Sequence, residues 1–131
     1  MGPQLGPLDY VYAPSADVAA DARWFVETLG AELVFAVESG TRVAMLRVGS
    51  GGPAILLTDH LPDDRPVLIY RVDDRAVTSA ELARGGWTAE RTIELPPGSC
   101  TTFAAPGGLR LAIYELTRPG VVESMAGRRD F

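Results

Sequence analysis

The sequence predicts an α+β fold built from two tandem βαβββ modules. Short stretches alternate apolar and polar residues, as strands do, and one stretch in each half repeats its apolar residues at helical spacing. Turn glycines recur 56 to 58 residues apart in three pairs, namely Gly30 and Gly86, Gly40 and Gly98, and Gly52 and Gly108. Any chain of this class has a turn about every ten residues, but the helix also recurs in the same slot, which favours a duplicated unit.

The first module is predicted to span residues 8–58. A strand over 8–13 is followed by a helix. Ser15 or Asp17 caps the start of this helix, which runs to about Leu29, and Gly30 ends it. The remaining strands of this module are expected at residues 32–38, 42–48 and 54–58.

The second module is predicted to span residues 67–116, after a polar, proline-containing connector over 59–66. Its helix is capped by Asp73 or Asp74 and ended by Gly85-Gly86. Its strands are expected at residues 67–72, 87–95, 100–105 and 109–116, with a turn at Pro96-Pro97-Gly98. Residues 8–116 are therefore expected to form a single domain, followed by a tail over 117–131 with a short helix over 121–127.

Composition restricts the function classes. The chain has 131 residues, a net charge of −5 and a pI of about 4.8, which disfavours nucleic acid and anionic membranes as partners. No segment approaches the length of a membrane span, and the expected location is the cytoplasm. The single cysteine, Cys100, is expected to be a small buried hydrophobe, because no base for a nucleophile is identifiable.

Three sequence strings carry a family resemblance. WFVETLG over 24–30, VLIYRVDD over 67–74 and FAAPGGLRLAIYEL over 103–116 resemble the helix, the opening strand of the second half and the terminal hairpin of the vicinal oxygen chelate superfamily. This superfamily includes glyoxalases, bleomycin-resistance proteins and dioxygenases. The resemblance covers residues 8–116, and it implies an open, cup-shaped mixed sheet with a central cleft and a homodimer.

The resemblance also implies four metal-ligand positions, two in each half. The matching residues are Tyr10, Leu56, Val67 and Ala112, of which only the tyrosine has a side-chain donor atom. We therefore expect neither a metal nor another cofactor.

Alternation along the strands defines the residues expected to face the cleft. The candidate ligand-binding residues are Tyr10, Tyr12, Leu56, Val67, Ile69, Arg71, Arg110, Ala112 and Tyr114. The opposite face is expected to pack against Phe25, Val26, Leu29 and Leu82 of the helices. The predicted cleft suits a largely apolar or aromatic ligand with a polar or anionic group. The open alternative is that these residues fill the cup as a second core or form a dimer interface.

Polar groups elsewhere offer weaker candidates. His60 lies in the connector near Asp59, Asp63 and Asp64, where a solvated, charged linker is favoured over a metal site. No catalytic residue is assigned, and three carboxylates near strand ends receive no role: Glu38, Glu94 and Glu115.

The leading functional hypothesis is a metal-independent protein that binds, and so sequesters, an aromatic or largely apolar small molecule. The first alternative is an enzyme of the same fold, such as a lyase, isomerase or dioxygenase, which has either a metal site not visible in the alignment or a metal-free mechanism. The second alternative is a vestigial or regulatory domain. The tail is expected to fold back over the cleft or to pack on a partner chain rather than to fray.

Overall fold

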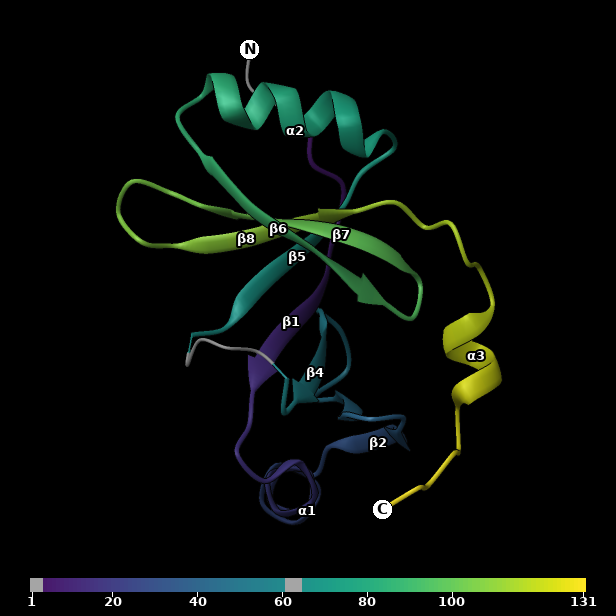
Figure 1. Cartoon of the computed structure of the whole chain (residues 1–131). Helices are drawn as coiled ribbons and strands as arrows, with labels where there is room; N and C mark the ends of the chain where they lie inside the picture. The colour runs from purple at the N-terminus through teal and green to yellow at the C-terminus, as the bar shows by residue number, and fades with distance from the viewer. Residues whose placement is uncertain (1–3, 61–64) are drawn as a thin grey trace. The chain divides into compact units, whose positions relative to one another are not determined.

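The computed structural model describes residues 4–60 and 65–131, which contain eight strands and three helices (Figure 1). They form two compact units. The first-module unit consists of Tyr10–Pro66 with Glu123–Phe131, and the second-module unit consists of Met1–Asp9 with Val67–Val122.

Helix α1 (Val18–Leu29) belongs to the first-module unit, whose strands pair in the order β2-β3-β4-β1. The strands are β1 (Leu8–Pro14), β2 (Glu32–Glu38), β3 (Arg42–Arg47) and β4 (Ala54–Thr58). β1 runs parallel to β4, and the other pairs are antiparallel. The Asp17 side chain accepts a hydrogen bond from the Ala20 N–H, and Gly30 ends the helix in the left-handed conformation, as predicted.

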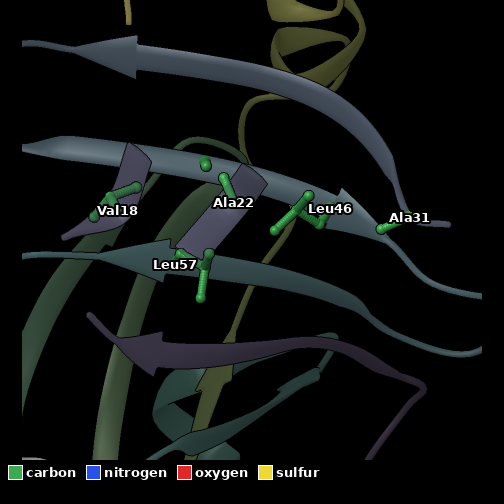
Figure 2. Packing of buried hydrophobic residues seen from close by; sticks show 6 residues of the cluster. Val18, Ala22, Ala31, Leu46 and Leu57 are labelled. Carbon is green, nitrogen blue, oxygen red and sulfur yellow. The ribbon is translucent and has the colours of Figure 1, made fainter. Parts of the chain in front are cut away.

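α1 packs on one face of this sheet through small side chains. Figure 2 shows Val18 and Ala22 of α1 close to Leu46 and Leu57 of the strands. The prediction that Val26 and Leu29 join this core is wrong, because they are 38% and 46% exposed. The buried stripe of α1 is narrow, so Val26 lies at its edge, where it lines a surface hollow of about 260 Å³.

The second-module unit repeats this arrangement. α2 (Arg75–Arg84) is capped by Asp74, and the strand order β5-β8-β7-β6 corresponds to β1-β4-β3-β2. The strands are β5 (Val67–Arg71), β6 (Thr88–Leu95), β7 (Gly98–Ala104) and β8 (Arg110–Tyr114). The parallel pair is β5 with β8, and Leu82 packs with Leu111 and Ile113. The α+β class and the two βαβββ modules are therefore confirmed.

The predicted turn is present at Pro96-Pro97, but Gly98 has a role beyond it. Gly98 begins β7 opposite Leu95, and its backbone does not have a positive φ. A Cβ atom there would lie 2.0 Å from the carbonyl oxygen of Glu115. Glycine is required at this position because two backbone segments approach each other closely.

The tail docks on the edge of β2 of its own chain and does not fray, while packing on a partner chain stays a prediction. After α3 (Val121–Met125), the N–H of Ala36 donates to the Arg128 carbonyl over 2.8 Å, and the N–H of Asp130 donates to the Ala36 carbonyl over 2.7 Å. Phe131 packs against the same core as α1. The tail therefore adds a short parallel segment that covers an edge strand.

Among residues 4–60 and 65–131, no helix combines the length and apolar character needed to cross a membrane.

Candidate functional site

Strand register brings together the predicted cleft residues within each unit. Tyr12 lies opposite Leu56 on the parallel strands β1 and β4, and Ile69 lies opposite Ala112 on β5 and β8. The two pairs are related by the same 56- to 57-residue offset seen in the sequence. Equivalent positions of the two modules therefore carry the predicted site.

The four expected metal-ligand positions do not fit a divalent ion. Tyr10 lies opposite Ala54 and is therefore a diagonal neighbour of Leu56 on β4. Val67 is likewise a diagonal neighbour of Ala112 on β8, because Ile69 lies opposite Ala112. One phenol among three hydrocarbon side chains cannot hold such an ion. The described part of the chain contains no group of three or more His, Cys, Asp or Glu residues that could hold one elsewhere.

The central residues of the predicted cleft are buried. The exposed fraction is 2% or less for Tyr12, Leu56, Val67, Ile69 and Ala112. This burial favours the alternative in which the apolar members pack as a core. Binding of a ligand by these side chains stays a prediction.

A chain of hydrogen bonds joins three polar side chains of the first-module unit. The hydroxyl of Tyr12 lies 2.6 Å from Nε2 of His60, and the hydroxyl of Thr58 lies 2.6 Å from Nδ1 of the same ring. Tyr12 and Thr58 are buried, whereas His60 is exposed. We refer to Tyr12, His60 and Thr58 as the hydroxyl–imidazole chain.

This arrangement can move a proton. In one tautomer Tyr12 donates to Nε2 while Nδ1–H donates to Thr58, and in the other Thr58 donates to Nδ1 while Nε2–H donates to Tyr12. The two states differ only by proton positions. A buried phenol is thus connected to an imidazole that contacts water.

Sequence reasoning missed the role of His60. The residue is exposed, as expected of a linker, but its ring is held by two hydroxyls. Strand parity was the available signal, because Leu56, Thr58 and His60 continue one alternation beyond the end of β4. Asp59 accepts a hydrogen bond from the Arg42 N–H, and the proposed neighbours Asp63 and Asp64 lie outside the described residues.

A second polar cluster lies in the second-module unit. The Tyr114 hydroxyl donates to Oδ2 of Asp9 over 2.5 Å, and Nε of Arg71 lies 3.4 Å from the same oxygen. Arg71 and Tyr114 face each other across β5 and β8. Asp9 thereby joins two residues of the predicted cleft, Arg71 and Tyr114, although Asp9 itself was not among the predicted cleft residues.

The last predicted cleft residue forms an ion pair. Arg110 is almost fully buried, and its Nε and Nη2 atoms both lie 3.1 Å from Oε1 of Glu90 on β6. Glu90 was also missed, because the bulge between Ala89 and Arg91 breaks the simple alternation of that strand.

The remaining candidates have structural roles. Burial raises the pKa of the Cys100 thiol to about 12, so the thiolate required of a nucleophile is scarce at neutral pH. The hydrogen bond from Ser99, followed by that from Arg118, holds the pKa of Glu94 below its usual value. Glu38 pairs with Arg42, and Glu115 accepts the Arg75 N–H at the start of α2.

Comparison with solved structures identifies the fold. Methylmalonyl-CoA epimerase from Mycobacterium tuberculosis superposes with a TM-score of 0.67 at 22% identity, over 83% of this chain and 87% of that one. A variant of the Streptomyces coelicolor epimerase in complex with 2-nitronate-propionyl-CoA gives 0.68 at 15% identity, over 87% and 99%. A hypothetical protein from Bacillus halodurans gives 0.69 at 13% identity, over 82% and 92%.

Comparison of the sequence alone finds no relative of this chain. No protein-family profile matches the chain, and no curated protein matches it significantly. The structural similarity at these identities establishes the architecture, and it confirms the resemblance inferred from the three sequence strings. The chain therefore has the fold of the vicinal oxygen chelate superfamily.

Proposed function

We propose that this protein is a metal-independent enzyme that moves a proton at a carbon atom of a small organic substrate. The observation that carries the proposal is the hydroxyl–imidazole chain, in which the only histidine of the sequence bridges two hydroxyls at 2.6 Å each. Positioned groups of this kind supply general acid–base catalysis.

In the proposed reaction Tyr12 exchanges the proton with the substrate, and His60 acts through Tyr12. The phenol gives its proton to Nε2 of His60, and the resulting phenolate takes a proton from a C–H bond next to a carbonyl group. The electron pair of that bond remains on the substrate as an enolate. Return of the proton from Tyr12 to carbon, and from Nε2 to the phenolate, restores both partners. The exposed imidazole exchanges its proton with water in between.

The fold neighbours favour an enzyme over a sequestering protein. Two of the three solved structures compared above are methylmalonyl-CoA epimerases, and one of these holds 2-nitronate-propionyl-CoA. An epimerase inverts a carbon centre that bears a hydrogen, which is proton-transfer chemistry. Thioesters of CoA are therefore the first substrates to test. Homodimer formation and a cytoplasmic location remain predictions from the resemblance and the composition.

The test is deuterium incorporation from D₂O into candidate substrates, followed by NMR, with methylmalonyl-CoA and propionyl-CoA as the first probes. We expect incorporation with the wild type and a loss of about 10²-fold in Tyr12→Phe. Tyr70→Phe is the matched control, because Tyr70 lies on β5 outside the hydroxyl–imidazole chain. An unchanged rate in Tyr12→Phe would contradict the proposal.

The second candidate is sequestration of an apolar compound. One observation favours it: the surface hollow of about 260 Å³ beside α1 is lined mainly by apolar side chains, among them Ala22, Val26, Leu33 and Phe131. A ligand that raises the melting temperature of the wild type but incorporates no deuterium would support this candidate over the enzyme.

A further inference from the structure

We propose that Arg71 is the anchor of a carboxylate-binding site in the second-module unit, held in position by Asp9 and Tyr114. The ligand class is a small organic acid that presents a planar carboxylate. This inference goes beyond the proposed proton transfer and does not depend on it, because Tyr12 and His60 belong to the other unit.

The guanidinium group of Arg71 has donors available for a ligand. Its Nε faces Oδ2 of Asp9 at 3.4 Å, and its side chain is 42% exposed. Within the described residues, its Nη atoms make no hydrogen bond to the protein. The outer edge of a guanidinium with both Nη groups accessible matches the two oxygens of a carboxylate in a bidentate pair.

Asp9 pairs with the guanidinium, and Asp9 is itself held in place. The Tyr114 hydroxyl donates to the same Oδ2 atom over 2.5 Å, and Tyr114 is only 1% exposed. A surface ion pair by itself contributes little to stability. Here a buried phenol holds the carboxylate that pairs with a partly exposed arginine, and second partners of this kind help to position a binding side chain.

The backbone of Arg71 is fixed as well. Its N–H donates to the Pro7 carbonyl over 3.0 Å, and its carbonyl accepts from the Gly6 N–H over 2.8 Å. A Cβ atom on Gly6 would lie 2.6 Å from that carbonyl oxygen, so the close approach requires glycine. A ligand that pairs with Arg71 therefore orders little additional structure, which favours binding.

The charge of the cluster bears on the ligand class. Asp9 and Arg71 carry opposite charges, so the ion pair is neutral overall. With a bound monocarboxylate the cluster carries one net negative charge, and with a bound phosphate dianion it carries two. We assign a monocarboxylate as the ligand, and phosphate is the contrasting probe because a guanidinium can pair with both.

The experiment compares matched ligands by NMR titration of the full chain. The probes are 4-phenylbutyrate, its uncharged amide and inorganic phosphate, and the signal is the Nε–H resonance of Arg71 together with the backbone amides. We expect the carboxylate to bind at least about tenfold more tightly than the amide or phosphate, a difference of about 1.4 kcal/mol.

Variants separate recognition from general stability. Arg71→Met is expected to abolish the preference for carboxylate over amide, and Tyr114→Phe to reduce it. Arg84→Met, at an exposed position of α2, is the matched control and is expected to keep it. Loss of stability alone would weaken both ligands equally and leave their ratio unchanged.

Three results would overturn the proposal. They are no binding of the carboxylate by the wild type, equal affinities for carboxylate and amide, and an unchanged preference in Arg71→Met. Equal or tighter binding of phosphate would contradict the assigned ligand class. Tyr12→Phe is expected to retain the carboxylate preference, so failure of the proton-transfer proposal and failure of this one are distinguishable.

Discussion

Nε2 of His60 lies 2.6 Å from the phenol oxygen of Tyr12, although the two residues are 48 positions apart in the chain. The parallel pairing of β1 with β4 produces this contact, because Tyr12 lies opposite Leu56 and the chain continues from β4 to His60 (Figure 1). The fold thereby connects a buried hydroxyl with an exposed titratable ring.

Removal of the Thr58 hydroxyl tests the third member of the chain. Thr58→Val keeps the shape of a fully buried side chain but removes the partner of His60 Nδ1. We expect deuterium incorporation to fall about tenfold, the equivalent of one hydrogen bond that no longer orients the ring. The ¹⁵N shifts of the imidazole, measured on the same sample, should change. Unchanged shifts would show that Thr58 does not determine the tautomer.

The docking of the tail is expected to depend on pH through Asp130. Its pKa is lowered by the hydrogen bond from Arg128 and, second, by the Glu38 N–H. Since the pKa in the folded protein lies below the unfolded value of about 3.9, the stabilisation is complete above that value. It is lost as the pH falls further, through the folded pKa. Amide shifts of Ala36 and Glu38, followed from pH 6 to pH 2, should report release of the tail.

The control for tail docking is Asp130→Asn. This variant keeps a side-chain oxygen for the Glu38 N–H but loses the charge that pairs with Arg128. Its amide shifts should depend less on pH in the acidic range. Identical titration curves for the wild type and the variant would contradict the assignment to Asp130.

Gly98 should tolerate no side chain. Gly98→Ala places a Cβ atom 2.0 Å from the Glu115 carbonyl oxygen, so we expect a loss of about 1–3 kcal/mol in the free energy of unfolding. Gly107→Ala is the matched control, because nothing lies within 4 Å of its added Cβ. Urea denaturation of both variants provides the measurement, and equal stabilities would refute the close approach.

Cys100 should be unreactive in the native protein. Burial raises the pKa of its thiol to about 12, so almost no thiolate exists at pH 8. We expect no reaction with a thiol reagent until the chain is unfolded by denaturant. Rapid modification in native buffer would mean that the side chain is accessible.

Much of the fold could be predicted because its signals are local. Alternation, helix caps at Asp17 and Asp74, and the glycine at position 30 determine elements from neighbouring residues, and the structure confirms them. The role of Gly98 could not be predicted, because the carbonyl that excludes a side chain belongs to Glu115 on a distant segment.

The candidate site was only partly predictable for the same reason. Strand parity selected Tyr12, Arg71 and Tyr114, but their partners His60 and Asp9 come from the start of the connector and the start of β1. Local patterns do not contain such pairings. The docking of the tail on β2 likewise depends on contacts between segments about 90 residues apart.

The most direct test of the central claim is the pH dependence of deuterium incorporation in the wild type, Tyr12→Phe and His60→Gln, with imidazole titration of the wild type by NMR. We predict that the rate follows the ionisation of His60 and that both variants lose the activity and its pH dependence. A His60→Gln variant that incorporates deuterium at the wild-type rate, with the same pH profile, would contradict the account.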